Sequence, residues 1–539
     1  MSEILSISLS QPSNHVITHL YNTQESHIPY TKKAPVNYTN GVFLSTSLQN
    51  GYTNYSPRAI IYDLQGGFGS LSKYEYHDPK NTFNNISQSH QLFTNTNVSI
   101  IPKNQYQLNL DKGITEQDLL TTSNTKYWSD YNKLIYTPKS LNTIPNFKHN
   151  SQSYGYHKNF ENLKFDNFKV GSDEFSTNLD YVDNQIDNFR YHLEKCDSLQ
   201  GINIISELNS GWSGYTNEFL TTIIDEYFNS NHKNSIWLYG LISSRNIDTS
   251  KGSSKLLSTI SQIKSLIELN KNCSLFFPIN MNQIPSNSNA LLNDNYDNES
   301  LWHSASISSL FINSIWGINN QSKNSTSMSI MEDMILRGYE NRKIINEIKL
   351  NNLEYPQIGL SHINNLISNV DISNYYNEGI SPQQASLTSS ESLELSVPSF
   401  IPNSTNYKSS TKYFIKNYIV PEDHKEIEKH LIDDNEGNGI PKNLFKNRDM
   451  NDILKVETFP SKILKSQDKF TFYSEFNINT NLKQDLKSYQ KLIRNIHPSR
   501  IDAMEILDDK AELIEDIDYL IEQYTIDYEL SDESDDDDI

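Results

Sequence analysis

The chain has 539 residues, and 45 Lys and Arg against 66 Asp and Glu give a formal net charge of −21. This length predicts more than one packed domain, and the acidic balance argues against direct nucleic-acid binding, which needs clustered Lys and Arg. No apolar run reaches the roughly 20 residues of a transmembrane helix, and the two cysteines, Cys196 and Cys273, lack the spacing of metal ligands.

The first half of the chain alternates short apolar runs with amphipathic stretches. Alternating or continuous apolar residues predict strands at 3–9, 59–64, 201–206, 236–241 and 274–277. Apolar residues at intervals of three and four predict helices that include Val16, Phe219 and Leu256. Strands that alternate with helices in this way predict a mostly parallel sheet, covered by helices on both faces.

The second half of the chain has a weaker apolar periodicity. We predict a helical stretch at 331–350 and an insertion in the Ser-, Asn- and Pro-rich residues near 374–410. Apolar residues at helical spacing predict one long amphipathic helix at 499–530, and its acidic polar face favours core packing over membrane contact. Residues 531–539 form an acidic tail that we expect to be disordered.

Two segments resemble the tubulin family. The opening MSEILSISLSQPSNHVITHLY matches the tubulin start in strand length, loop position and the residues Glu3, Ile4, Ile7, Gln11 and Asn14. The segment YSPRAIIYDL at 55–64 resembles the tubulin segment VPRAxxxDLEP. The resemblance implies an α/β, tubulin/FtsZ-like fold: a parallel-sheet nucleotide-type domain at 1–325, a smaller α+β domain at 326–498, and C-terminal helices.

The phosphate loop that the resemblance implies is altered in this chain. Tubulins bind nucleotide phosphates with a strand, the loop SLGGGTGSG and a helix, and residues 206–214 match that loop. Ser213 and Gly214 persist, whereas Trp212 takes the place of a glycine. Added Cβ atoms restrict the backbone, and an indole needs space that a phosphate would occupy. The resemblance therefore implies weak GTP binding at most.

Other positions of the site also depart from the tubulin pattern. Ser10 replaces a glycine, Pro12 removes a backbone donor, and Gln65 replaces an acidic residue. The loop that supplies the acid for GTP hydrolysis in tubulin filaments has no match, so we expect no GTPase activity. Gln11 matches the family glutamine, and Asp63 stands where the family faces a metal. Asp63 could hold Mg²⁺ through a bound nucleotide or cap a loop.

The base-binding end of the site is better preserved. Residues 297–301 resemble the tubulin segment DNEAL, whose asparagine contacts guanine, which assigns Asn298 to the base. With no gap, the stacking aromatic falls on Trp316 and the second guanine asparagine on Asn320. The alternative, that Trp316 is a core residue and both asparagines belong to an Asn-rich composition, stays open.

Four segments together identify the chain as similar to the Misato proteins, which are tubulin-related proteins of eukaryotes. These segments are the altered start at 7–15, the SPRA segment at 56–59, YWSDY at 127–131 and SGWSG at 210–214. The resemblance implies a non-enzymatic role in the partitioning of mitochondria and the inheritance of mitochondrial DNA. An assembly or chaperone-type cofactor for tubulin is the alternative, and a GTP-dependent filament protein is a third.

The resemblance also implies where the protein acts. Residues 1–30 contain Glu3 and Glu25 and no arginine, so we expect no cleaved import or secretion signal. We therefore expect a protein of the cytoplasm and of the cytosolic face of mitochondria. Its expected partners are outer-surface or cytoskeletal proteins, or tubulin and its folding machinery.

Overall fold

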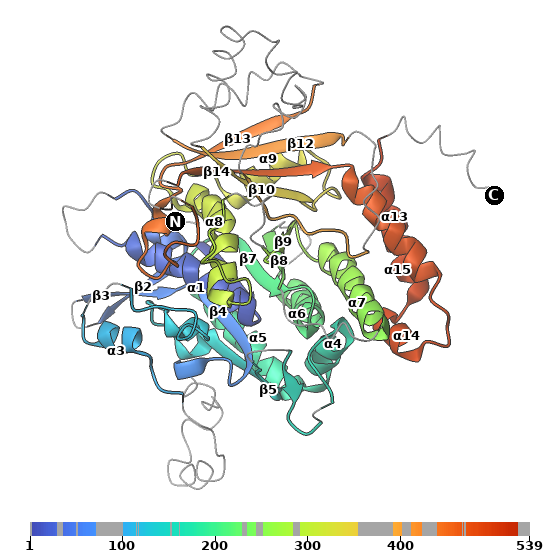
Figure 1. Cartoon of the computed structure of the whole chain (residues 1–539), viewed down its shortest axis with the longest axis horizontal. Helices are drawn as coiled ribbons and strands as arrows, with labels where there is room; N and C mark the ends of the chain where they lie inside the picture. The colour runs from blue at the N-terminus through green and yellow to red at the C-terminus, as the bar shows by residue number, and fades with distance from the viewer. Residues whose placement is uncertain are drawn as a thin grey trace, which may run out of the picture.

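The described part of the fold has two large sheets, a two-stranded sheet and a group of C-terminal helices (Figure 1). The computed structural model describes residues 3–29, 36–49, 52–71, 101–114, 116, 118–150, 154–160, 162–228, 234–243, 252–283, 291–353, 392–401, 411–422, 439–465, 467 and 470–526. The predicted acidic tail at 531–539 lies outside these residues, and so does most of the predicted insertion near 374–410.

Seven strands of the described chain form the main sheet, in the order β6-β5-β4-β1-β7-β8-β9. In chain order they are β1 (Glu3–Leu9), β4 (Ala59–Gln65), β5 (Leu141–Lys148), β6 (Tyr156–His157), β7 (Leu199–Glu207), β8 (Ser235–Ile242) and β9 (Leu275–Asn280). All neighbours are parallel except β5 and β6. The strand order reverses at β1, because the chain builds outward from β1 to β5 and then returns to β7 on its other side.

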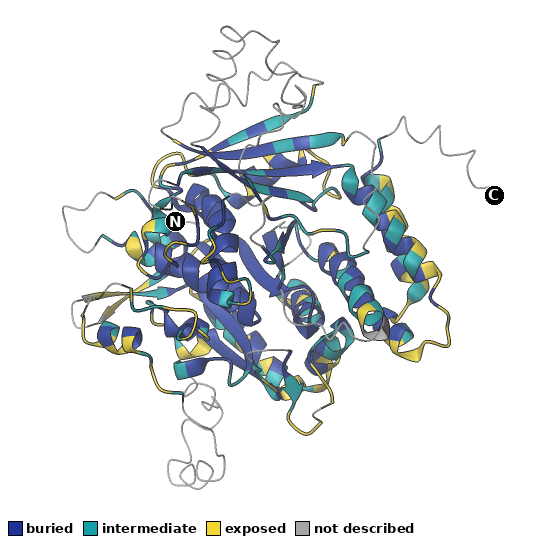
Figure 2. Ribbon diagram, in the orientation of Figure 1, coloured by how far each residue is buried: buried dark blue, intermediate teal, exposed yellow. Residues whose placement is uncertain are grey.

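Helices cover both faces of the main sheet, as the sequence predicts. They are α1 (Gln11–Ser26), α4 (Phe168–Thr177), α5 (Leu179–Glu194), α6 (Gly211–Tyr227), α7 (Gly252–Lys271) and α8 (Leu301–Asn320). On one face Ser8 Oγ donates to Asn14 of α1, and α1 packs against α8. On the other face, Tyr62 contacts Phe219 of α6. The main sheet is therefore buried on both faces (Figure 2).

The second sheet is mixed and follows the first in sequence. Its order is β11-β10-β14-β12-β13, and only β12 and β13 pair in parallel. The strands are β10 (Glu347–Asn352), β11 (Ser392–Glu394), β12 (Tyr413–Pro421), β13 (Lys442–Asn447) and β14 (Phe472–Asn479). A large cluster of buried apolar residues runs from Ile4 to Tyr524 and joins the two sheets in one core. The predicted order, a parallel-sheet domain and then an α+β domain, is confirmed.

The predicted helix at 331–350 is wrong in its second half. Helix α9 (Met328–Leu336) ends early, and β10 begins at Glu347. The backbone turns left-handed at Arg337, with φ 48°, and at Gly338, with φ 86°. Glycine adopts this conformation without steric cost, so the pair ends the helix.

The single C-terminal helix predicted at 499–530 is also wrong, because the structure has two helices there. They are α14 (Ile501–Leu507) and α15 (Lys510–Gln523), and they follow α13 (Asn481–Arg494). Asp508 has φ 62°, and the Asp509 carboxylate accepts the N–H groups of Ala511 and Glu512. The break is thus a left-handed residue followed by a new N-cap.

Sequence reasoning missed several elements of the first domain. These are strands β5 and β6, the hairpin β2 (Leu44–Gln49) and β3 (Tyr52–Pro57), helix α3 (Gln105–Asp111), and helices α4, α5 and α8. Both cysteines are free thiols, Cys273 buried and Cys196 half-buried. Within the described ranges, none of the helices combines the length and apolar character that crossing a bilayer requires.

Candidate functional site

The candidate site lies where the order of the main sheet reverses. Open parallel sheets bind ligands outside the carboxyl ends of their strands, beside this reversal point. Leu9 at the end of β1 lies in register with Tyr62 of β4 and with Ser206 of β7. The predicted strand ends therefore converge at this edge of the sheet. Asp63 lies in β4, Gln11 begins α1, and Ser213 and Gly214 lie in the first turn of α6.

The turn from β1 into α1 keeps a backbone shape that suits glycine. Ser10 has φ 128° and ψ 160°, a region that residues with a Cβ rarely adopt. Its Oγ caps α1 by accepting the Ser13 N–H at 3.2 Å. The chain therefore retains the tubulin-like turn although Ser10 replaces the glycine of that family.

Asp63 is held by neighbouring protein groups. Its Oδ2 accepts from Asn14 Nδ2 at 2.9 Å, and its Oδ1 accepts the Leu64 N–H at 2.8 Å. The turn after β4 packs directly on the carboxylate, since a Cβ on Gly67 would lie 2.2 Å from Oδ1. These contacts match the alternative in which Asp63 caps a loop, here the turn after β4. Among the described residues, no cluster of three or more His, Cys, Asp and Glu suits a metal ion.

Gln11 differs from its neighbours at the site. Its side chain is 2 % exposed, and no group of the described chain forms a hydrogen bond with Nε2 or Oε1. An unpaired buried amide costs about 1–3 kcal/mol. Gln11 is thus a predicted ligand contact whose whole side-chain amide keeps hydrogen-bonding capacity, whereas Trp316 and Asn320 each have one such atom, Nε1 and Oδ1.

The N-terminus of α6, where a phosphate would bind, is closed by the segment around Phe165. The Gly211 N–H donates to the Phe165 carbonyl at 3.1 Å, and the Ser213 N–H to the Ser210 carbonyl at 3.2 Å. The Trp212 indole packs edge-on against the Phe165 ring at 5.3 Å. The first N–H of α6 and the space beside it are therefore used for contacts within the chain.

Gly214 and Ser213 have packing roles in this loop. A Cβ on Gly214 would lie 1.9 Å from the Phe168 carbonyl, so α4 approaches α6 through this glycine. A Cβ on Gly171 of α4 would likewise lie 1.6 Å from the Gly211 carbonyl. Ser213 Oγ donates to the Ser210 carbonyl at 2.8 Å. Ser213 Oγ also accepts from Ser265 Oγ of α7 at 2.7 Å. Of the two residues that persist from the tubulin loop, Gly214 therefore lets α4 pack against α6, and Ser213 links the loop to α7.

Sequence reasoning missed Glu207, a buried carboxylate at the end of β7. It accepts from Ser210 Oγ at 2.8 Å and from Ser243 Oγ after β8. Glu207 and Asp63 end the two strands beside β1, so about two strand spacings, roughly 10 Å, separate their backbones. Two carboxylates at this edge disfavour a phosphate. A sequence signal for Glu207 was available: it is an acidic residue at the end of a predicted strand, the same pattern that drew attention to Asp63.

Trp316 and Asn320 lie at the opposite end of the sheet. Trp316 stacks on Phe43 with ring centroids 4.1 Å apart, and Asn320 Nδ2 donates to Gln24 Oε1 at 2.6 Å. Gln24 is near the end of α1, which runs back from the site toward the amino ends of the strands. The alternative that Trp316 is a core residue matches this placement.

Asn298 lies far from Trp316 along the length of α8. It precedes α8, and Trp316 lies fifteen residues beyond Leu301, a rise of about 22 Å along an α-helix. The structure therefore does not bring Asn298, Trp316 and Asn320 into one base-sized pocket. The prediction aligned the tubulin pattern with this chain without a gap. That alignment puts Asn298 at one end of α8 and Trp316 and Asn320 near the other, so one continuous helix separates them.

The YWSDY segment covers the turn after β4. Trp128 is buried and packs edge-on against Phe68 at 5.9 Å. The Asp130 carboxylate accepts the Tyr127 N–H at 2.8 Å, and burial raises the pKa of Asp130 to about 6 against the opposing effect of that N–H. The Tyr131 hydroxyl lies 2.9 Å from His15 Nδ1 in α1. The aromatic residues of this segment thus pack over the start of α1.

Comparison with known proteins finds tubulin-related matches along the chain. A family model described as the Misato Segment II tubulin-like domain matches residues 2–112, and one described as the Tubulin domain matches residues 117–319. Protein DML1 of Scheffersomyces stipitis is 46% identical over 100% of both chains. Protein DML1 of Candida albicans is 39% identical over 99% of this chain and 100% of its own. Protein DML1 of Debaryomyces hansenii is 39% identical over 99% of each chain.

Proposed function

The chain belongs to the Misato/DML1 family of tubulin-like proteins, and on that premise we propose that it is a non-enzymatic factor in mitochondrial partitioning and distribution. Through that role it supports the inheritance of mitochondrial DNA. The family resemblance supports the mitochondrial part of the proposal. The hydrogen bond from the Gly211 N–H to the Phe165 carbonyl carries the non-enzymatic part.

GTP binds weakly at most in this proposal and is not hydrolysed. The phosphate-binding donors are used within the chain, Trp212 fills space beside them, and Glu207 and Asp63 add negative charge. Nucleotide extracted from freshly purified protein and identified by chromatography tests this. Stoichiometric GTP or GDP, or phosphate release that depends on the protein and stops in Asp63→Ala, would contradict it.

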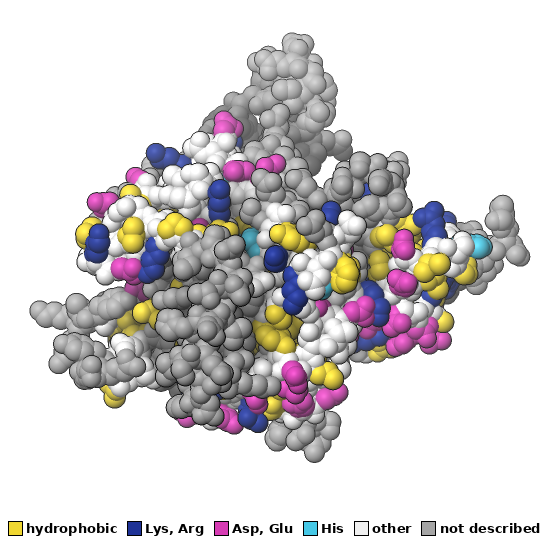
Figure 3. All heavy atoms as spheres, turned by 90° about the horizontal axis from the view of Figure 1, so that it is seen from below, with side chains coloured by type: hydrophobic (Ala, Val, Ile, Leu, Met, Phe, Trp, Pro, Cys, Tyr) yellow, Lys and Arg dark blue, Asp and Glu magenta, His cyan; other side chains and the backbone are white. Residues whose placement is uncertain are grey.

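The proposed location is the cytosolic face of mitochondria and the cytoplasm, reached through protein contacts. Figure 3 shows acidic side chains gathered on the side of the molecule where α14 and α15 lie. The exposed acids of these helices and of the turn between them are Asp502, Glu505, Asp508, Asp509, Glu512, Glu515, Asp518 and Glu522. Such a surface disfavours anionic lipid headgroups and DNA, and it favours a partner protein with a basic face.

A time course of depletion tests the cellular role. Mitochondrial shape and segregation are expected to change before mitochondrial DNA is lost, because the effect on DNA is indirect in this proposal. Protease treatment of intact mitochondria is expected to degrade the bound protein. Protection inside the matrix, or loss of DNA while organelle distribution stays normal, would refute the proposal.

A second candidate is an assembly cofactor for tubulin or for its folding machinery. The tubulin-like fold supports it, since a chain with tubulin's shape can present surfaces that tubulin's own partners bind. Affinity purification with mass spectrometry separates the two: tubulin or chaperone subunits support the cofactor role, and outer-surface proteins of mitochondria support the first. Sedimentation of purified protein that depends on GTP would favour a filament protein instead.

A further inference from the structure

A cleft of about 400 Å³ lies between the two domains, beside β9 at the edge of the main sheet and three strands away from β1. Leu266 of α7 and Pro278 of β9 contribute its wall on the main-sheet side. The opposite wall comes from β10, from the segment after β11, and from α13. Its volume is in the range that holds a small organic ligand or one or two side chains of a partner.

The cleft is lined by aromatic and aliphatic side chains together with carboxylates. Phe400 and Tyr489 stack there with ring centroids 5.4 Å apart, beside Leu482. All charged side chains among the described lining residues are carboxylates, namely Glu347, Glu394 and Asp485. Asp485 is half-buried, and burial raises its pKa, so its negative charge is held at an energetic cost; Glu394 is exposed at the rim.

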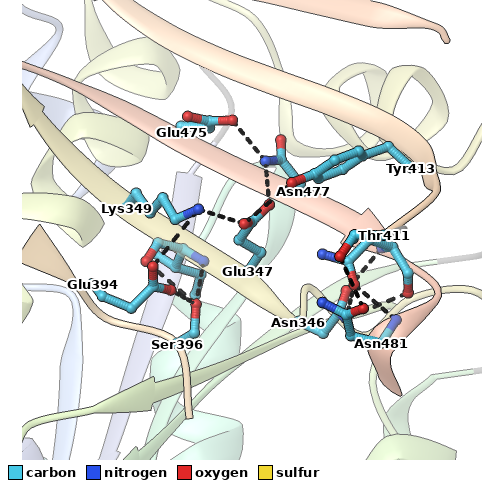
Figure 4. Close-up of polar contacts among 12 residues, drawn as sticks. Asn346, Glu347, Lys349, Glu394, Ser396, Thr411, Tyr413, Glu475, Asn477 and Asn481 are labelled. Carbon is cyan, nitrogen blue, oxygen red and sulfur yellow. Dashed lines mark hydrogen bonds and ion pairs between the residues drawn. The ribbon is translucent and has the colours of Figure 1, made fainter. Parts of the chain in front are cut away.

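One lysine beside the cleft offsets part of this charge (Figure 4). Lys349 Nζ lies 2.5 Å from Glu347 Oε1 and 3.7 Å from Glu394 Oε2. Asn477 Nδ2 also donates to Glu347 Oε2 at 2.7 Å, so Glu347 is well paired. A single ammonium group thus serves two of the three carboxylates, and Asp485 lies across the cleft on α13.

The geometry points to a binding site for an organic cation, in which a guanidinium or ammonium group on an apolar body pairs with Glu394 and Asp485. The carbon chain packs on Leu482, and the faces of Phe400 and Tyr489 add cation–π attraction. The same carboxylates exclude phosphates and other anions. An arginine of a partner polypeptide and a free small amine share this chemistry.

Binding to the full-length protein tests the site with three probes, measured by isothermal titration calorimetry. They are the capped peptide Leu-Arg-Leu, the same peptide with citrulline in place of arginine, and agmatine. Citrulline keeps the shape of arginine without its charge. The arginine peptide is expected to bind about tenfold or more tightly than the citrulline peptide, which corresponds to ~1.4 kcal/mol. Tighter binding of the peptide than of agmatine identifies a polypeptide source, and the reverse identifies a small amine.

Asp485→Asn and Glu394→Gln are each expected to weaken binding of the arginine peptide about tenfold. Glu505→Gln, an exposed change on α14 outside the cleft, is the matched control and is expected to have no effect. The two test variants lie on different elements, and circular dichroism checks that each is folded. Equal binding of both peptides, no binding of either cation, or full binding by folded Asp485→Asn and Glu394→Gln would overturn the proposal.

Discussion

Single residues at the strand ends show how the family's backbone is kept while its chemistry changes. Ser10 holds a glycine-like φ of 128°, Gly214 packs against α4, and Ser213 bonds to its own loop and to Ser265 of α7. Asp63 is 1 % exposed and is bound by Asn14 and by the backbone of Leu64. Residue identity at a family position is therefore a weaker guide to ligand binding than the contacts of that residue.

Strain at Ser10 gives the first prediction. Ser10→Gly is expected to stabilise the protein by about 1 kcal/mol, because glycine relieves the strained φ and loses little as an N-cap. Urea-induced unfolding measures the change. Ser210→Gly is the matched control: Ser210 caps α6 with an ordinary φ of −145° and donates to Glu207, so this substitution is expected to destabilise. A destabilised Ser10→Gly would mean that the hydroxyl contacts outweigh the backbone strain.

The buried Asp130 gives a prediction on pH. Its pKa is raised from 3.8 to about 6, so the folded protein holds this proton more tightly than the unfolded chain. The resulting stabilisation is complete below pH 3.8 and is lost as the pH rises to about 6; it is on the order of 2–3 kcal/mol. Asp130→Asn is expected to remove this loss and to keep the bond from the Tyr127 N–H. Thermal midpoints of both proteins between pH 4 and pH 7 measure it, and parallel curves would contradict the assignment.

Among the elements, α4 and the segment before it cover the N-terminus of α6, which is the phosphate-binding part of the candidate site. Helix α4 follows the Phe165 segment, whose carbonyl occupies the first N–H of α6, and the helices meet at Gly171 and Gly214. A phosphate site needs this helix N-terminus open, whereas a packed core needs it closed. In this chain the packing contact is the one that forms.

Gly214→Ala distinguishes packing from phosphate binding. The added methyl group would meet the Phe168 carbonyl, so the substitution is expected to destabilise the fold by about 2–3 kcal/mol. Thr221→Ala, an exposed change on the same helix, is the control and is expected to shift stability by less than ~0.5 kcal/mol. If Gly214→Ala keeps full stability and instead lowers nucleotide occupancy, the loop serves a phosphate after all.

At the scale of the whole molecule, two sheets share one core while the surface carries a net charge of −21. The joined core makes the domains a single packed body, and the acidic helices α14 and α15 lie at one side of it (Figure 1). Charge at this side acts at a distance of about one Debye length, roughly 8 Å at physiological salt. The surface therefore contributes to the approach of a partner more than to the fold.

Neutralising this surface tests its role in partner binding. The triple change Glu505→Gln, Glu512→Gln and Glu515→Gln is expected to reduce recovery of the protein on isolated mitochondria, because it removes attraction for a basic partner. Asp180→Asn, Asp183→Asn and Asp187→Asn on α5 form the control with the same change in net charge. Recovery of the unchanged protein is expected to fall as salt is raised. Equal recovery of both triple variants would exclude a local role for α14 and α15.

The sequence by itself determined the elements whose signal is local. Strands β1, β4, β7, β8 and β9 and helices α1, α6 and α7 follow from apolar periodicity, and the parallel order follows from their alternation. The convergence of the ends of β1, β4 and β7 follows as well, since parallel strands end at one edge. The altered loop at 206–214 also indicated that a phosphate would fit poorly.

The groups that contact the loop before α6 could be identified only from the tertiary structure. Phe165 lies outside every motif, and its contact with Gly211 depends on a segment 46 positions away in the chain. Phe43 likewise reaches Trp316 from a distant short helix and hairpin, and this contact places Trp316 in the core. Side-chain periodicity reports which face of an element is buried, and it carries no information on which distant group covers that face. For that reason the strand ends were predictable from the chain, and the closure of the phosphate loop was not.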